Sequence, residues 1–261
     1  MVPIRYNFRS LLVRKVTTLA TAGGIALVVF VFAAALMLGE GVERAMVSSG
    51  RSDTVIVLRK GSDNELSSGL GNDAYKKLGD RPEVAQVGGV GVIGEIVIVI
   101  TAEVDDDSET ISNVLVRGMP AEGMAFRPEA KIVSGRAPKP GTEEVIVGKA
   151  ISGRFKNIGP GKSFELRRNR PLKVVGEFSA GGSSYESEVW GDLDTIRKYL
   201  GRESVVSSAR VRLTDPTKFE AYRLSVEGDK DFSVKAMREA DYLVDLGPGA
   251  GTEGGTVCFE G

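Results

Sequence analysis

The sequence has 261 residues, 42% of them hydrophobic, and its 34 basic side chains nearly balance its 35 acidic ones. This composition excludes a disordered chain and a polybasic nucleic-acid-binding protein. There is no histidine and only one cysteine, Cys258, which excludes a Ser-His-Asp or Cys-His catalytic set, an internal disulfide, and a zinc site. We therefore expect no enzyme activity, no catalytic residue, no cofactor and no metal.

The first predicted element is a membrane-spanning helix. No charged residue occurs between Lys15 and Glu40. Residues 17–38 would form a helix of roughly 33 Å, enough to cross the ~30 Å hydrocarbon layer. One alternative is a cleaved signal peptide, but the apolar region of such a peptide runs only ~7–15 residues. The other is a buried soluble helix, which is rarely so long without a charge.

The flanking charges predict the topology. Four basic residues precede the span without an acidic one, whereas a mixed set follows it: Glu40, Glu43, Arg44 and Arg51. The positive-inside rule then places residues 1–16 in the cytosol and the main domain outside the membrane. Apolar residues at helical spacing within 1–16 further predict an amphipathic segment on the membrane surface. Alternatively, its arginines only set the topology.

A β-α-β pattern follows the span. Thr54–Leu58 is a β-branched and aliphatic run, which predicts a buried strand. After a polar loop, Asn72 or Asp73 begins a short helix that stops at Gly79, and Val84–Val90 is the next predicted strand.

The same order returns near the far end of the chain. Ser208–Leu213 alternates like a strand, Asp215 and Pro216 open a helix, and Phe232–Ala236 is a further strand. Two such units predict a split β-α-β lobe, formed by residues 39–94 and 206–241.

The intervening residues 95–205 predict an inserted β-rich lobe. Short strands separated by turns are expected at Ile96–Thr101, Asn113–Arg117, Glu144–Val147, Ser163–Leu166 and Leu172–Phe178. One helix interrupts them, since Asp192 caps residues 193–200 and Gly201 follows. The predicted fold class is α+β: an N-terminal transmembrane helix and then a two-lobed extracytoplasmic domain.

Three motifs suggest chemistry that their context does not support. Gly89–Gly94 matches G-x-G-x-x-G, but it leads into the predicted strand at 95–100 and not into a helix, so we expect a flexible crossing between lobes. Asp105–Asp107 lacks the alternating ligands of a calcium loop and predicts a solvated turn. The Gly181–Ser187 loop before Trp190 has serines without a usual base.

Several stretches together resemble the MacB/FtsX-type ABC-transporter permeases. The N-terminal segment Asn7–Leu19, the glycine-containing span and Gly39-Glu-Gly41 are similar to the start of such a permease. The stretches similar to its extracytoplasmic core domain are Val116–Met119, Ile132–Arg136, Glu144–Gly148, Val174–Phe178 and Phe232–Glu239. The resemblance covers about residues 5–241, which makes 39–241 the core domain.

This resemblance implies a bacterial inner-membrane subunit that does no chemistry itself. A separate cytoplasmic ATPase would hydrolyse ATP, and a homo- or heterodimer of permease subunits would relay the motion outward for export or lipoprotein release. Membrane lipid and a periplasmic adaptor are the other implied partners, and no nucleic acid is expected. The alternatives are a single-pass anchored binding or sensing domain without an ATPase, and an anchored hydrolase.

The last segment differs from that family. Residues 242–261 resemble a C-terminal fragment of the UvrA excinuclease ATPase, but they contain no Gly-Lys-Ser/Thr phosphate loop and cannot bind ATP alone. Family permeases have three further spans after the outer domain, and this sequence has none. We therefore expect a truncated or chimeric product with a poorly anchored tail.

Overall fold

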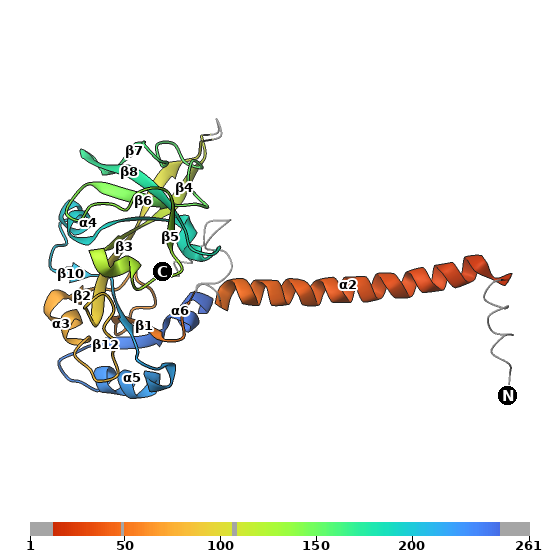
Figure 1. Cartoon of the computed structure of the whole chain (residues 1–261), viewed down its shortest axis with the longest axis horizontal. Helices are drawn as coiled ribbons and strands as arrows, with labels where there is room; N and C mark the ends of the chain where they lie inside the picture. Colours follow the sequence, from red (N-terminus) through yellow and green to blue (C-terminus); the bar gives the residue numbers. More distant parts are fainter. Residues whose placement is uncertain (1–12, 48–49, 106–108, 246–261) are drawn as a thin grey trace. The chain divides into compact units, whose positions relative to one another are not determined.

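The computed structural model describes residues 13–47, 50–105 and 109–245 (Figure 1). The chain divides into two compact units, residues 1–44 and 45–261. Most of the predicted amphipathic segment 1–16 lies outside the described residues.

The first unit is dominated by helix α2 (Lys15–Val47), which confirms the predicted helix and continues it along the chain to Val47. Within its residues Lys15–Leu38, an 18-residue window has a mean hydropathy of 2.4. Within the described residues, α2 is the one helix long and apolar enough to cross a membrane, judged by length and composition. Its direction across a membrane stays a prediction.

The second unit is built on a continuous sheet of ten strands (Figure 1). Nine strands follow one another across it: β12 (Val234–Arg238), β1 (Thr54–Arg59), β11 (Ser208–Arg212), β3 (Val92–Glu103), β4 (Ile111–Met119), β9 (Glu188–Asp192), β6 (Glu144–Gly148), β8 (Arg170–Ser179) and β5 (Lys131–Gly135). The tenth, β7 (Ser163–Arg167), pairs with β8 outside this path. Two short strands, β2 (Leu70–Gly71) and β10 (Val205–Val206), form a separate pair.

Short helices lie between these strands or, in the case of α6, after the last one. They are α3 (Asn72–Lys77), α4 (Leu193–Leu200), α5 (Phe219–Glu227) and α6 (Glu239–Asp245), with 3-10 turns η1 (Ala121–Met124), η2 (Ser184–Ser187) and η3 (Pro216–Lys218). As predicted, Asp192 caps α4, because its Oδ2 accepts a hydrogen bond from the Thr195 N–H at 2.9 Å. Gly201 ends α4 at a φ of 67°, a conformation that favours glycine.

The two β-α-β units interlock as the split arrangement predicts. Strand β11 lies between β1 and β3 and is antiparallel to both. Strand β1 in turn lies between β11 and β12 and is antiparallel to both. The units β1-α3-β3 and β11-α5-β12 therefore each receive a strand of the other. This confirms the α+β class, with an apolar N-terminal helix ahead of a sheet-rich domain.

The predicted strand at Val84–Val90 is wrong. Only isolated bridges form there, Val84 with Leu213 and Val87 with Val90. Gly88 and Gly89 have φ angles of 63° and 85°, so the chain turns at the point where the strand was expected. The second strand of this unit is instead the start of β3.

Strand β3 crosses between the two predicted lobes without a break. Its first residues pair with β11 and those from Ile96 onward pair with β4. The expected flexible crossing at Gly89–Gly94 is therefore wrong at its end, since Gly94 is a buried strand residue. A Cβ on Gly94 would lie 2.7 Å from Val206 Cγ1, so glycine is needed there for close packing. The lobe boundary at residues 94/95 stays a prediction.

The predicted strands of the inserted region are present, but two of the strands that it adds to the ten-stranded sheet were not predicted. β4, β6, β7 and β8 each contain the expected segment. Edge strand β5 and central strand β9 were missed. Strand β9 joins β4 to β6 and so is needed to make the sheet continuous.

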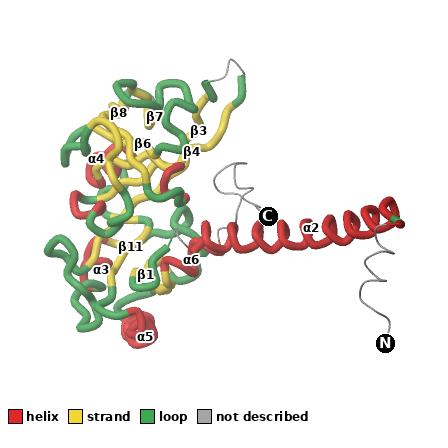
Figure 2. The backbone as a smooth tube through the Cα atoms, turned by 45° about the vertical axis from the view of Figure 1, so that its right-hand side comes forward, coloured by secondary structure: helices red, strands yellow, loops and turns green. Residues whose placement is uncertain are grey.

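The sheet has different cores on its two faces. Figure 2 shows the backbone of helices α3, α4 and α5 and of the strands. The largest core packs the side chains of α4 and α5 and the end of α3 against alternate strand residues such as Val55, Val57 and Val116. Ile56 and Leu58 point to the opposite face, because neighbouring strand residues alternate. That face carries two smaller apolar clusters, one around Trp190 and one around Ile56.

Candidate functional site

A cluster of buried charges links the two small apolar clusters. We call it the ion cluster; its members are Glu65, Glu95, Arg117, Arg127, Glu188, Arg210 and Glu239. None of these side chains is more than 7% exposed. The cluster is unusual because charged side chains are almost never fully buried unless they are paired.

Strand alternation brings most of these residues to one face of the sheet. Glu95 is opposite Ser208 in the β3–β11 ladder, and Arg210 lies two residues further along β11. Arg117 on β4 is opposite Trp190 on β9, two residues from Glu188. Since residues two apart share a face, these side chains meet on one side of the sheet.

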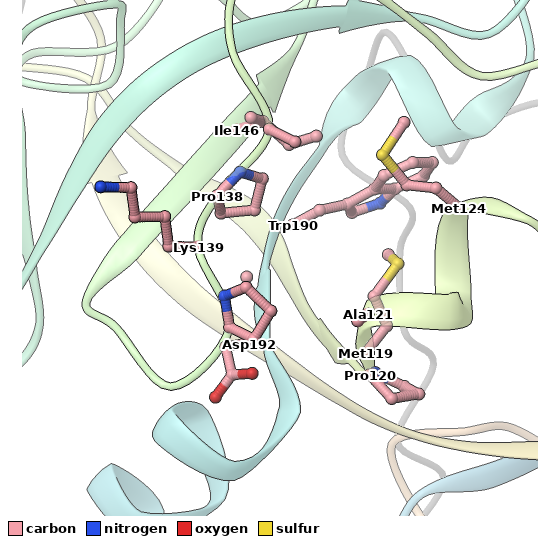
Figure 3. Close-up of a pocket in the computed structure, with 12 residues that line it drawn as sticks. Met119, Pro120, Ala121, Met124, Pro138, Lys139, Ile146, Trp190 and Asp192 are labelled. Atoms are coloured by element: carbon pink, nitrogen blue, oxygen red, sulfur yellow. The ribbon is translucent and has the colours of Figure 1, made fainter.

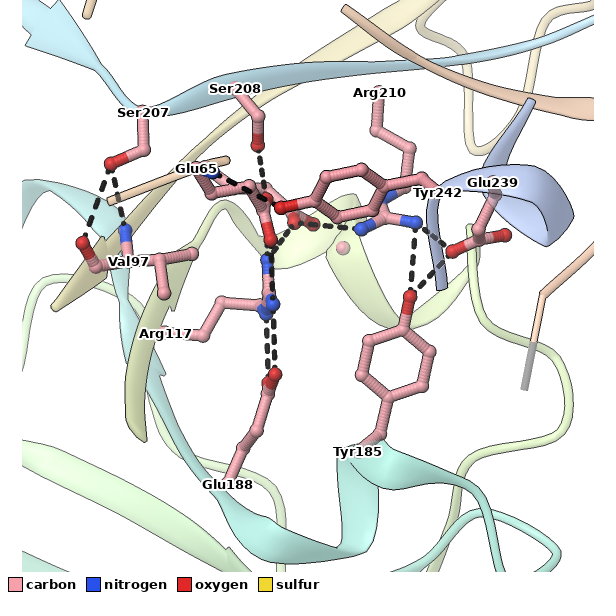
Figure 4. Close-up of polar contacts among 12 residues, drawn as sticks. Glu65, Val97, Arg117, Tyr185, Glu188, Ser207, Ser208, Arg210, Glu239 and Tyr242 are labelled. Atoms are coloured by element: carbon pink, nitrogen blue, oxygen red, sulfur yellow. Dashed lines mark hydrogen bonds and ion pairs between the residues drawn. The ribbon is translucent and has the colours of Figure 1, made fainter. Parts of the chain in front are cut away.

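Arg117 is the centre of the ion cluster (Figure 4). Its Nε and Nη2 both donate to the Glu188 carboxylate at 2.8 Å. Its Nη1 donates at 2.9 Å to Glu65 and to Glu95. One guanidinium thus binds carboxylates from the loop after β1, from β3 and from β9, and two-pronged pairing of this kind is the strongest form of ion pair.

Glu95 is the most enclosed carboxylate, with no exposed side-chain surface. It accepts hydrogen bonds from Arg127, which follows η1, at 2.6 and 2.7 Å. Burial alone would raise the pKa of Glu95, but the charges of Arg127, Arg210 and Arg117 outweigh burial and hold that pKa well below its usual range. Glu95 is therefore ionised whenever the domain is folded near neutral pH.

The same balance between burial and opposite charge acts on Glu65 and Arg117. Burial would raise the pKa of Glu65, but Arg117 and Arg210 lower it below the usual value. Burial would lower the pKa of Arg117, yet Glu188 and Glu65 raise it well above the ordinary value. Held ionised in this way, the groups are suited to holding structure and not to proton transfer.

The ion cluster also reaches the two ends of the sheet domain. Arg210 pairs with Glu239 at the start of α6, and the Tyr185 hydroxyl donates to the same carboxylate. The second oxygen of Glu239 accepts the backbone N–H of Arg51 at 3.2 Å. The segment that enters β1 is therefore bound to the helix that follows β12 through the carboxylate of Glu239.

Close packing reinforces this junction. A Cβ on Gly50 would lie 2.5 Å from the Cα of Ala240. The Tyr242 hydroxyl accepts the backbone N–H of Glu65 at 3.1 Å, and the Tyr242 side chain is buried with Ile56 and Leu58. The end of the domain is thereby fixed to its beginning.

The sequence predicted no site residue, and it missed the ion cluster. A signal was present, because Glu95 and Arg117 are charges at inward positions of strongly apolar strands. The other motifs are placed elsewhere. The Gly181–Ser187 loop folds into η2 and sends Tyr185 into the core. Asp105 pairs with Lys162 at 3.5 Å, whereas Asp106, Asp107 and Cys258 lie outside the described residues.

A family model described as the MacB-like periplasmic core domain matches residues 18–228. The chain belongs to this family. No match was found among curated proteins.

Solved structures agree with the family match. The periplasmic region of MacB from Actinobacillus actinomycetemcomitans is similar at 15% identity with a TM-score of 0.52, over 76% of this chain and 93% of that one. The extracellular domain of the noncanonic ABC-type transporter YknZ from Gram-positive bacteria is similar at 17% identity with a TM-score of 0.51, over 71% of this chain and 100% of that one. At these identities the likeness shows a shared fold.

The family and the apolar helix together indicate a membrane-anchored protein with an extracytoplasmic domain. The comparisons do not show the predicted resemblance of residues 242–261 to UvrA. Residues 246–261 lie outside the described part of the chain, whereas Tyr242 is packed within the domain.

Proposed function

We propose that the chain is a permease-type transmembrane subunit of an ABC transporter of the MacB/FtsX type. Its outer domain relays conformational change, driven by a separate cytoplasmic ATPase, to the extracytoplasmic side for export or lipoprotein release. The observation that carries this proposal is the family match, which starts within the apolar helix and continues through the sheet domain.

The ion cluster supports a relay through the outer domain. Its carboxylates and guanidinium groups come from β3, β4, β9, β11 and α6, so they connect strands from both parts of the sheet. Separating one partner from such a set leaves a buried charge uncompensated and costs about 3–5 kcal/mol. In this proposal, a displacement at Glu239 acts on Arg210, which pairs with it, and through Arg210 on Glu95.

The partners in this proposal are an ABC ATPase in the cytosol and a second permease subunit in a homo- or heterodimer. A periplasmic adaptor and membrane lipid complete the assembly. The N-terminus lies in the cytosol, in agreement with the basic residues that precede α2.

Co-purification from native membranes tests the proposal. The tagged full chain is extracted in mild detergent after crosslinking, and its partners are identified by mass spectrometry. We expect an ABC ATPase and a second permease subunit. Recovery of the chain without any ATPase would instead support a single-pass anchored binding or sensing domain.

Cysteine labelling tests the topology separately. In a Cys258→Ser background, Lys60→Cys in the sheet domain is compared with Arg9→Cys ahead of the helix. A membrane-impermeant maleimide applied to spheroplasts should label only Lys60→Cys, and labelling of only Arg9→Cys would reverse the orientation.

A further inference from the structure

Two surface features lie outside the proposed relay, an apolar cleft and the β7–β8 hairpin. In the cleft, drawn in Figure 3, the side chains of Trp190 and Ile146 are only 1% exposed, so it offers a partner little side-chain surface. The β7–β8 hairpin differs, because its charged side chains are exposed. It lies at the end of the sheet opposite β12, and β11, β3, β4, β9, β6 and β8 separate β7 from β1 (Figure 1).

The hairpin carries an unbalanced positive charge. Its residues 163–173 include four basic side chains and one acidic side chain, whereas basic and acidic residues are nearly equal in number over the whole chain. The four basic residues are all exposed: Arg167, Arg168, Arg170 and Lys173. Across the described residues, none of the four takes part in an ion pair. The hairpin therefore presents positive charge that no acidic side chain of this domain neutralises.

The tip of the hairpin concentrates this charge in a fixed turn. Arg167 is directly opposite Arg170 in the β7–β8 ladder, and only Arg168 and Asn169 separate them along the chain. Asn169 has a φ of 60°, a left-handed conformation that asparagine tolerates. The Arg170 guanidinium lies 5.1 Å from the centre of the Tyr199 ring, which holds it in place. Like charges directly opposite each other destabilise a strand pair, and an acidic partner would relieve this repulsion.

The outer edge of β7 is available for hydrogen bonding. The Val174 N–H donates to the Lys162 carbonyl at 2.9 Å, so the backbone of residue 162 points toward β8. Backbone groups alternate in direction along an antiparallel strand, and those of Ser163 and Glu165 therefore point away from β8. Both residues are exposed, and among the strands that the structure describes β7 pairs with β8 alone. Such an edge is a template for a further strand.

We propose that the β7–β8 hairpin binds an extended acidic segment of a partner protein, which adds to the sheet as a strand beside β7. Main-chain hydrogen bonds supply the affinity in this mode of binding, and side chains supply the specificity. Acidic residues of the segment lie beside Arg167 and the tip, and an uncharged or basic residue lies opposite Glu165. This assignment goes beyond the transporter function and stands whether or not an ATPase partner is recovered.

The same surface disfavours two other occupants. An anionic lipid headgroup would meet the arginines, but it has no peptide backbone to pair with the edge of β7. A second copy of β7, aligned antiparallel about Glu165, would place the two Glu165 side chains opposite each other, which is unfavourable. Positive charge beside an open strand edge therefore fits an acidic polypeptide.

A short peptide tests the proposal. The probe is a fluorescently labelled hexapeptide, Glu-Glu-Val-Thr-Val-Thr. Aligned antiparallel to β7, its threonines lie opposite Glu165 and Ser163, and its second glutamate lies opposite Arg167. Its fluorescence anisotropy is measured as the full chain in phosphatidylcholine nanodiscs is added. We expect saturable binding that weakens as the ionic strength rises.

Two modified peptides separate strand pairing from charge attraction. N-methylation of the first threonine removes an N–H that faces β7, whereas N-methylation of the second valine removes one that faces away. Both peptides keep the same charge. We expect the first modification to abolish saturable binding and the second to leave it unchanged.

Matched protein variants locate the site. Arg168→Glu should weaken peptide binding by about threefold to tenfold. Lys235→Glu, at an exposed position of β12 at the other end of the sheet, makes the same change in charge and should leave binding unchanged. Ser163→Pro removes an outward N–H of β7 and should weaken binding, whereas Ser163→Ala keeps that N–H and should not. Circular dichroism checks that each variant is folded.

Three results would overturn the proposal. The first is the absence of saturable peptide binding. The second is equal binding by the two methylated peptides, or by Arg168→Glu and Lys235→Glu. The third is displacement of the peptide by phosphatidylglycerol vesicles with no effect of either N-methylation, which would make the hairpin a site for anionic headgroups.

Discussion

Replacing Arg117 by methionine removes the centre of the ion cluster while keeping a side chain of similar length. Glu65 and Glu188 lose the arginine that pairs with them, and Glu95 retains Arg127 and Arg210. Four buried glutamates then face two arginines. Breaking a buried ion pair costs about 3–5 kcal/mol, and a domain of this size loses about 2–4 °C of Tm for each kcal/mol. We expect Arg117→Met to lower the Tm of the sheet domain by about 6–20 °C.

The assay is thermal unfolding of the full chain in detergent, followed by Trp190 fluorescence. Trp190 is bonded to Glu188 and reports directly on this region. Arg136→Met is the matched control, since Arg136 pairs with Glu144 at the surface with 49% of its side chain exposed, and its Tm should match that of the parent. Adding Glu188→Gln to Arg117→Met should restore part of the lost Tm, because one uncompensated charge is removed.

The dependence on pH gives a second check. Without Arg117, burial would dominate the pKa of Glu65 and raise it, so the folded variant would bind a proton more tightly than the unfolded chain. The free energy of unfolding of Arg117→Met should therefore approach that of the parent as the pH falls from about 8 to about 5. A Tm of Arg117→Met within the error of the control, or a double variant no more stable than the single one, would refute the reasoning.

Three other predictions concern the same domain. Because the pKa of Glu95 is lowered in the folded domain, its ionised carboxylate stabilises the domain above the unfolded pKa of about 4.5, and this stabilisation is lost as the pH falls below that value. The free energy of unfolding, measured in urea, should therefore be level from about pH 7 to about pH 5 and decline under about pH 4.5. A domain that is equally stable at about pH 3 would contradict this. Gly50→Val should destabilise the domain by about 1–3 kcal/mol in urea unfolding because a Cβ would collide with Ala240, whereas Gly69→Ala, with open space around it, is the control. Asp192→Ala should cost about 1 kcal/mol in the same assay through loss of the α4 cap and Asp192→Asn much less, and equal losses would argue against capping.

Capping residues and apolar runs in the sequence predicted the helices and strands that depend on only a few neighbouring residues. The Asp192 cap, the Gly201 stop and the aliphatic run at Thr54–Leu58 each fix a helix or strand over a few residues, and all three are found. Strand β9 was missed because Glu188 and Asp192 give it charged ends that resemble loop sequence. The true start of strand β3 was hidden by Gly91 and Gly94, which serve close packing and not a turn.

The ion cluster is beyond local prediction for a different reason. A charged residue within an apolar strand indicates that an oppositely charged residue must lie beside it in the fold, but the sequence does not show which residue that is. Arg117 finds one carboxylate 52 residues earlier in the chain and another 71 residues later. Only the strand order β11-β3-β4-β9 brings these segments together. The sequence therefore indicates that such a site is needed, and the topology decides its members.

Strand β1 receives the chain directly after α2, which ends at Val47, and it is hydrogen-bonded on both sides, to β11 and β12. Because antiparallel ladder bonds run perpendicular to the strands, a load along β1 shears all bonds of both ladders at once and does not peel them one by one. In a pulling experiment, the strand next to the membrane anchor should therefore yield at a higher force than edge strand β5, which has only β8 beside it. The outer domain is therefore mechanically stronger at the strand where traction from the membrane would enter it than at its far edge strand β5.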